Sequence, residues 1–176
     1  MDLITTIRNS IRAIPDYPKP GIIFRDISPL LQSASAFRAT IEAFAQRYEA
    51  QGIDQVAAVE ARGFIFGAAL AQRLGCGLTL LRKPGKLPGP VVKECYALEY
   101  GEDALELQEC AFREPQRVVL MDDLLATGGT VAAAARLLSR TKAELVEAAF
   151  VITLDDLPGE QKLRDLGITC YTLCRF

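Results

Sequence analysis

Apolar residues recur along the chain at two spacings, one typical of amphipathic helices and one of buried strands. Near the N-terminus, five residues follow helical spacing: Leu3, Ile4, Ile7, Ile11 and Ile14. Pro15 would end this first helix. A second helix is expected from a cap at Ser35 to Gly52, because the apolar residues between them share one face.

The rest of the chain alternates short apolar strands with helices. Strands are predicted at residues 56–59, 78–81, 117–121, 148–154 and 168–174, and helices at residues 64–74, 130–140 and 160–166. Continuous apolar strands separated by helices predict an α/β fold with a twisted, mostly parallel sheet flanked by helices. Ligands of such sheets bind beyond the carboxyl ends of the strands.

One stretch breaks this alternation. Residues 82–93, RKPGKLPGPVVK, have no periodicity and contain four basic residues and five Gly or Pro, which predicts an exposed, mobile loop. Short strands at residues 96–100 and 104–107 flank the turn Gly101-Glu102-Asp103 and predict a hairpin.

Charge and composition restrict the chemistry. The 176 residues suit a single domain, and 20 Lys and Arg against 22 Asp and Glu do not indicate electrostatic binding of nucleic acid. The sequence has no histidine, which removes the usual general base and the Ser-His and Cys-His pairs. Proton transfer would therefore fall to a carboxylate, Tyr, Lys, Cys or the substrate.

Cysteine usage and hydropathy bear on compartment and partners. The five cysteines are odd in number, widely spaced and without a C-x-x-C pair, so neither a disulfide framework nor a zinc site is expected. The longest uncharged apolar run is far too short to span a bilayer. We expect a cytoplasmic protein with no membrane partner and no dedicated metal-ligand cluster.

The most informative segment covers residues 118–130, VVLMDDLLATGGT. An apolar strand is followed by Asp122 and Asp123, and the glycine-rich turn then enters a helix. Glycines admit close backbone approach, while successive amides and the helix dipole favour an anion, so the turn is suited to phosphate. Carboxylates beside a phosphate can accept hydrogen bonds from sugar hydroxyls, which predicts a phosphorylated ribose. The plainer alternative is a strand-to-helix turn with Asp caps.

Other nucleotide motifs are not matched. A Walker loop requires Gly-Lys followed by Ser or Thr, but Gly85-Lys86 is followed by Leu87. No G-x-G-x-x-G follows any predicted strand. Neither an ATPase nor a dinucleotide oxidoreductase is indicated.

This segment resembles the phosphoribosyl-pyrophosphate signature of type I phosphoribosyltransferases, in the form DDLLATGGT that the adenine-specific branch carries. Five further stretches agree: DYPKPGIIFRDISPLL (16–31), EARGFIFGAALA (60–71), RKPGKLPG (82–89), YALEYG (96–101) and GEQKL (159–163). The resemblance extends from about Ile11 onward. It implies the type I phosphoribosyltransferase fold, with a small hood at about residues 1–34 and a mobile loop and hairpin at about residues 82–107.

The resemblance also implies an activity. The expected reaction is attack of adenine N9 on phosphoribosyl pyrophosphate, with inversion at the anomeric carbon, to give AMP and pyrophosphate in purine salvage. Mg²⁺ would be held mainly by substrate oxygens and water. A homodimer is implied as well.

The resemblance assigns a role to individual residues. The 5-phosphate would be held by Ala126, Thr127, Gly128, Gly129 and Thr130, and the ribose by Asp122 and Asp123. The pyrophosphate residues would be Glu60, Ala61, Arg62, Arg82, Lys83 and Lys86, with the Glu60–Ala61 peptide in the cis form. The adenine residues would be Ile23, Phe24, Arg25 and Leu124. Glu99 and Arg62 would be catalytic, and Tyr100 would help to cover the site.

Backbone recognition would distinguish adenine from other purines. Adenine presents an acceptor at N1 and a donor at its 6-amino group, so one backbone N–H and C=O pair can read it without a side chain. The resemblance places this pair on Arg25. Guanine and hypoxanthine carry the opposite pattern and would leave buried polar groups unpaired. Two alternatives remain open: a phosphoribosyltransferase for another base, and a non-catalytic sensor of phosphoribosyl pyrophosphate.

Overall fold

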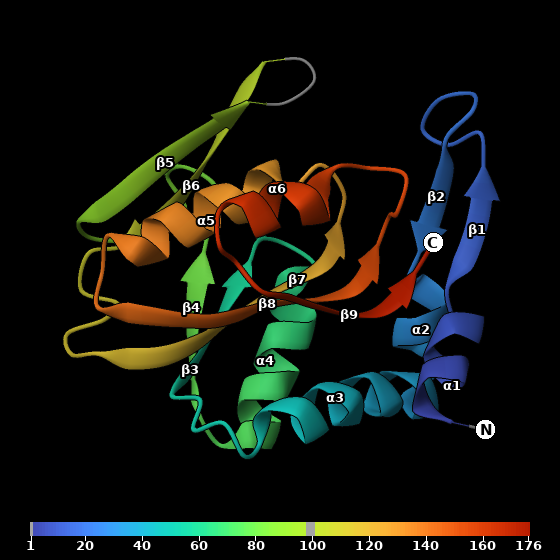
Figure 1. The fold of residues 1–176 in the computed structure, drawn as a ribbon, viewed down its shortest axis with the longest axis horizontal. Coiled ribbons are helices and arrows are strands. Elements are labelled where there is room, and N and C mark those ends of the chain that lie inside the picture. Colours follow the sequence, from blue (N-terminus) through green and yellow to red (C-terminus); the bar gives the residue numbers. More distant parts are fainter. Residues whose placement is uncertain (1, 98–100) are drawn as a thin grey trace.

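The central element of the fold is a parallel sheet of five strands in the order β4-β3-β7-β8-β9. The computed structural model describes residues 2–97 and 101–176 (Figure 1). The strands are β3 (Gln55–Val59), β4 (Gly77–Leu81), β7 (Gln116–Leu125), β8 (Ala143–Thr153) and β9 (Cys170–Arg175). Every neighbouring pair is parallel, which confirms the expected α/β class.

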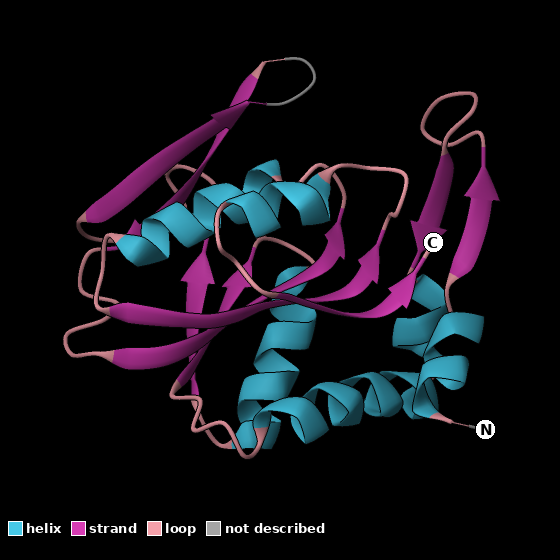
Figure 2. Ribbon diagram, viewed as in Figure 1, coloured by secondary structure: helices cyan, strands magenta, loops and turns pink. Residues whose placement is uncertain are grey.

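Helices cover both faces of this sheet (Figure 2). The helices are α1 (Leu3–Asn9), α2 (Ser28–Gln32), α3 (Ala34–Tyr48), α4 (Gly63–Leu74), α5 (Gly129–Ser139) and α6 (Gly159–Asp165). Alternate residues of β7 serve the two cores: Val119 and Met121 pack with α3 and α4, whereas Val118 and Leu120 pack with α5. The near-continuous apolar strands thus reflect burial on both faces.

The N-terminal segment corrects one expectation. The first helix ends at Asn9 instead of continuing to Ile14, and β1 (Arg12–Pro15) pairs antiparallel with β2 (Ile23–Asp26). Pairing with β2, a strand that the pattern did not indicate, overrides the helical spacing of Ile11 and Ile14. The short helix α2 was also not expected, and Ser33 rather than Ser35 caps α3, accepting a hydrogen bond from Ala36 N at 3.2 Å.

The hairpin is longer than predicted. It pairs β5 (Val91–Ala97) with β6 (Glu102–Gln108), so β5 begins inside the stretch expected to be a loop. The basic loop, residues 82–90, is bonded to β6 because Arg82 and Glu106 exchange two backbone hydrogen bonds of 3.0 and 2.7 Å. The part of residues 82–93 before β5 remains without regular structure.

Candidate active site

The phosphate cradle, residues 126–130, connects the end of β7 to the start of α5. Gly128 adopts a left-handed conformation (φ +77°) immediately before the helix. Residues 122 and 124–131 line a small cavity of about 80 Å³ at this turn. The first amides of α5 have no intrahelical acceptor and therefore face an anion-sized space. All five predicted phosphate residues are brought together here.

The two aspartates lie within β7 rather than after it, because β7 continues to pair with β8 as far as Leu125. Asp123 is only 6% exposed, and its carboxylate accepts a hydrogen bond from Arg62 Nε at 2.5 Å. Burial raises the pKa of Asp122, and the negative charge of Asp123 raises it further. The structure therefore joins a predicted ribose residue to a predicted pyrophosphate residue.

The pyrophosphate loop, residues 60–63, approaches the end of β7 closely. The Glu60–Ala61 peptide is cis, as expected. A Cβ on Gly63 would lie 2.8 Å from the carbonyl oxygen of Met121 and 2.9 Å from Asp122 Oδ1. Only a residue without a side chain lets this loop and the aspartates meet without displacement.

Glu60 contacts the basic loop. Its Oε2 accepts hydrogen bonds from Lys83 N at 2.9 Å and from Arg82 Nε at 3.1 Å. The Lys83 amide, followed by the Arg82 side chain, lowers the pKa of Glu60 despite the opposing effect of burial. A carboxylate engaged in this way orients cations around the loop, since it would itself repel pyrophosphate.

The basic residues differ in their surroundings. Lys83 Nζ donates to Tyr96 Oη at 2.9 Å and forms an ion pair with Asp103, so its charge is already engaged by the hairpin. Arg82 also donates to the carbonyl oxygen of Lys86 at 3.1 Å. Lys86 itself is exposed. Of the basic-loop residues assigned to pyrophosphate, Lys86 is the one most open to a ligand.

The predicted adenine residues Ile23, Phe24 and Arg25 lie on β2. Pro15 lacks an N–H, so its pairing with Ile23 cannot exchange two hydrogen bonds. Hydrogen-bonded and non-hydrogen-bonded pairs alternate along an antiparallel ladder. The backbone of Phe24 therefore bonds to β1, while the N–H and C=O of Arg25 point to the open edge of β2. Outside the β1–β2 ladder, no hydrogen bond among residues 2–97 and 101–176 engages this backbone pair.

The other predicted adenine residue, Leu124, and the predicted hairpin residues Glu99 and Tyr100 are distant from β2 in the sequence. Leu124 of β7 packs against the same core cluster as Ile27, which directly follows β2. Glu99 and Tyr100 lie outside the described residues. The described end of the hairpin, where Tyr96 pairs with Asp103, lies beside the cradle, since a Cβ on Gly129 would lie 3.6 Å from Tyr96 Cδ2.

Two features of the site were not anticipated from the sequence. Gly159 begins α6 directly behind the cradle, where a Cβ would lie 2.2 Å from the carbonyl oxygen of Ala126. The carboxylate of buried Glu106 accepts a hydrogen bond from Gly85 N at 2.9 Å and so holds the basic loop. The stretch GEQKL contained Gly159, but no local signal connected it with the cradle.

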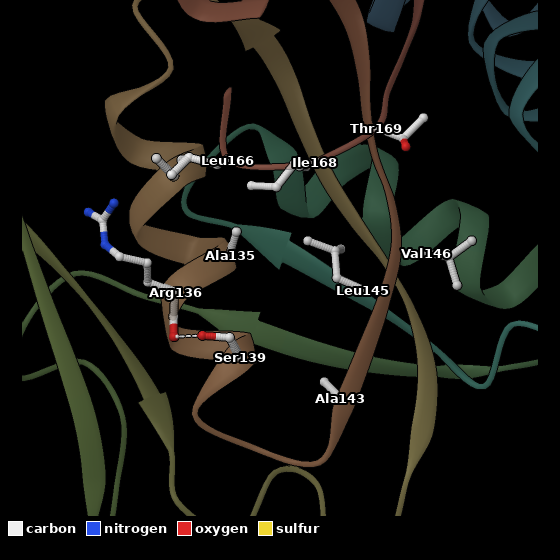
Figure 3. A pocket seen from close by; sticks show the side chains of 11 residues that line it. Ala135, Arg136, Ser139, Ala143, Leu145, Val146, Leu166, Ile168 and Thr169 are labelled. Atoms are coloured by element: carbon white, nitrogen blue, oxygen red, sulfur yellow. Dashed lines mark hydrogen bonds between the residues drawn. The ribbon is translucent and has the colours of Figure 1, made fainter. Parts of the chain in front are cut away.

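A separate hollow of about 370 Å³ lies between α5 and the loop before β9 (Figure 3). Its lining includes Leu145, Ile168 and Ser139, whose hydroxyl donates to the carbonyl oxygen of Arg136 at 2.8 Å. The hollow lies at the amino ends of β8 and β9, opposite the edge where ligands of parallel sheets bind. We therefore do not assign it to the active site.

In the described part of the chain, no three His, Cys, Asp or Glu side chains form a group able to hold a metal ion. None of the helices described is long and apolar enough to cross a membrane.

Comparisons with known proteins agree with this geometry. A family model described as a phosphoribosyl transferase domain matches residues 26–170. The chain is 63% identical over 172 residues to an adenine phosphoribosyltransferase of Idiomarina loihiensis, covering 98% of this chain and 97% of that one. It superposes with a TM-score of 0.92 on the adenine phosphoribosyltransferase of Thermoanaerobacter pseudethanolicus, at 47% identity over 98% and 99% of the two chains. The Saccharomyces cerevisiae enzyme, solved with adenine and an imino-altritol bisphosphate, gives a TM-score of 0.92 at 36% identity, covering 98% of each chain.

Proposed function

Because this chain belongs to the adenine phosphoribosyltransferases, we propose that its cradle, loops and hood act together on phosphoribosyl pyrophosphate and adenine. The reaction transfers the phosphoribosyl group to N9 of adenine and yields AMP and pyrophosphate, a step of purine salvage. The observation that carries the residue assignment is the cradle: free helix amides around a phosphate-sized cavity, with two aspartates beside it.

Binding of phosphoribosyl pyrophosphate would use the carboxyl end of β7. The amides of residues 126–130 hold the 5-phosphate, and Asp122 and Asp123 accept hydrogen bonds from the ribose hydroxyls. Arg62 then exchanges its partner Asp123 for the pyrophosphate and neutralises the charge that develops on this leaving group. Arg82, Lys83 and Lys86 add positive charge to that side, with Glu60 and the Ala61 peptide shaping the loop.

Adenine would bind between the hood and the sheet. The N–H of Arg25 donates to N1, and its C=O accepts from the 6-amino group. Ile23, Phe24 and Leu124 pack around the purine. Glu99 receives the ring proton as N9 attacks, and Tyr100 helps the hairpin to exclude water from an oxocarbenium-like transition state.

Mg²⁺ fits this oxygen-rich site. Asp122 and Asp123 offer oxygen ligands only, which suits Mg²⁺ contacted through water and held chiefly by substrate oxygens. When bound, the ion would neutralise part of the pyrophosphate charge.

The assembly and compartment are proposed on separate grounds. A homodimer is supported by two exposed apolar side chains, Ile65 on α4 and Leu78 on β4. β4 is an edge strand of the sheet and leads directly into the basic loop. A cytoplasmic location is supported by the five cysteines, all of which are free thiols.

The decisive experiment measures AMP and pyrophosphate formed from phosphoribosyl pyrophosphate with adenine, hypoxanthine or guanine, with and without Mg²⁺. We expect turnover with adenine that depends on Mg²⁺, and a loss of about 10⁴-fold in kcat/KM for the other bases. Comparable turnover with guanine would indicate a different base specificity. Binding of phosphoribosyl pyrophosphate without turnover of any base would instead indicate a sensor.

A further inference from the structure

The aromatic ring of Phe176 lies between the sheet and the hood. Figure 1 shows this end of the chain beside β2. Two guanidinium groups lie over the ring: that of Arg25 on β2, 4.3 Å from the centroid, and that of Arg8 on α1, 4.5 Å away. Such contacts are attractive because the cation faces the negative side of the aromatic quadrupole.

Phe176 is itself fixed to the sheet by its backbone. Its N–H donates to the carbonyl oxygen of Thr153 at 3.0 Å, and its carbonyl oxygen accepts from Asp155 N at 2.8 Å. Thr153 ends β8, so the ring stands on the carboxyl edge of the central sheet. The ring therefore has a defined position before it meets Arg25.

The side chain of Arg25 depends on this ring. Its Nε is buried and has no hydrogen-bond partner among the described residues. A buried unpaired donor is unfavourable, so this rotamer needs another stabilising contact, and the stack on Phe176 supplies one. The backbone of the same residue presents its N–H and C=O to the open edge of β2.

We propose that Phe176 is a positioning residue for base recognition: by holding the Arg25 side chain, it sets where the adenine-reading N–H and C=O of β2 stand relative to the sheet. This inference rests on the proposed adenine site. The β1–β2 hairpin forms a separate sheet of two strands, so its placement depends on contacts such as this one. If β2 were displaced, adenine would bind more weakly, while the phosphoribosyl site would stay unchanged.

The test compares Phe176→Leu, which keeps apolar bulk but removes the aromatic face, with Phe176→Tyr, which keeps the ring. We expect Phe176→Leu to raise the KM for adenine about 3- to 10-fold, with the KM for phosphoribosyl pyrophosphate within about twofold of wild type. Phe176→Tyr should retain the wild-type adenine KM. Thermal unfolding of each variant shows that it remains folded.

Two further variants separate positioning from general stability. Arg8→Met removes the other cation over the ring and the hydrogen bonds from Arg8 to the carbonyl oxygen of Arg175. Because the backbone of Phe176 stays bonded to Thr153 and Asp155, the adenine KM should stay within about twofold of wild type. In an Arg25→Met background, Phe176→Leu should have no additional effect, because the contact that it removes is already lost.

The proposal is overturned if folded Phe176→Leu binds adenine as wild type does. It is equally overturned if both KM values and kcat change together, or if Arg8→Met raises the adenine KM as much as Phe176→Leu. These outcomes differ from failure of the proposed function, in which the wild-type protein itself would form no AMP from adenine.

Discussion

Replacing Gly159 with alanine should weaken binding of phosphoribosyl pyrophosphate although Gly159 need not touch it. This glycine begins α6 and backs onto the cradle. The added Cβ would lie 2.2 Å from the carbonyl oxygen of Ala126, 3.1 Å from its carbonyl carbon and 3.0 Å from Leu125 Cδ1. The nearest of these atoms is backbone, so the clash cannot be relieved by a side-chain rotation.

The size of the effect follows from the displacement required. Ordinary carbon contacts are about 3.5–4.0 Å, so α6 and the cradle must separate by about 1 Å. Overpacking of this kind costs about 1–3 kcal/mol. A shift of about 1 Å in a binding constellation can lower its effectiveness about 100-fold. We expect the Kd for phosphoribosyl pyrophosphate to rise about 10- to 100-fold.

Isothermal titration calorimetry with phosphoribosyl pyrophosphate measures this change, and urea unfolding measures stability in parallel. Gly77→Ala is the matched control, because its Cβ would crowd only the flexible Gln55 side chain, at 3.0 Å from Cγ, and would meet the Asp54 carbonyl oxygen at an ordinary 3.5 Å, far along the sheet from the cradle. The control should keep the wild-type Kd. Wild-type affinity in Gly159→Ala would refute the view that α6 supports the cradle.

Three further substitutions test the site and the core. Glu99→Gln should lower kcat about 10²- to 10⁴-fold with little change in Tm, and near wild-type turnover would reject its role as proton acceptor. Gly128→Val should abolish calorimetric binding of phosphoribosyl pyrophosphate, because φ is +77° and a Cβ would lie 3.0 Å from the Gly159 carbonyl oxygen; retained affinity would count against the cradle. Glu147→Leu removes the buried partner of half-exposed Arg47, paired at 2.5 and 2.7 Å, and should lower the free energy of unfolding by about 2 kcal/mol in urea; an unchanged urea midpoint would contradict this.

The central sheet could be predicted because its signals are local. Each strand contains a short, mainly apolar run, and the cradle is one unbroken segment in which apolar run, carboxylates, glycines and helix follow in order. The β1–β2 pair could not be predicted in this way. The spacing of Ile11 and Ile14 is compatible with a helix, and nothing in the local sequence argues against one. Residues 12–15 form a strand because they pair with residues 23–26.

The contacts between site segments also lacked a local signal. Arg62 and Asp123 are 61 residues apart, and Glu60 and Lys83 are 23 apart. A charged residue in a sequence is expected to have either an oppositely charged partner or contact with water. Which residue becomes the partner depends on which strand ends meet at the sheet edge. For that reason residue types and roles could be proposed before the fold was known, but not the ion pair that Arg62 must exchange on binding substrate.

Hydrogen bonds and ion pairs connect the segments around the site. Glu60 binds the Lys83 amide, Lys83 binds Asp103 and Tyr96, and the Tyr96 ring lies next to Gly129 of the cradle. Amides and guanidinium groups bind phosphate oxygens without titrating, so a site without histidine loses nothing in substrate binding. Removal of the purine proton is the one step that requires a group able to change its charge. Since imidazole is absent, the proposed mechanism depends on a carboxylate at Glu99 more strongly than on any other single side chain.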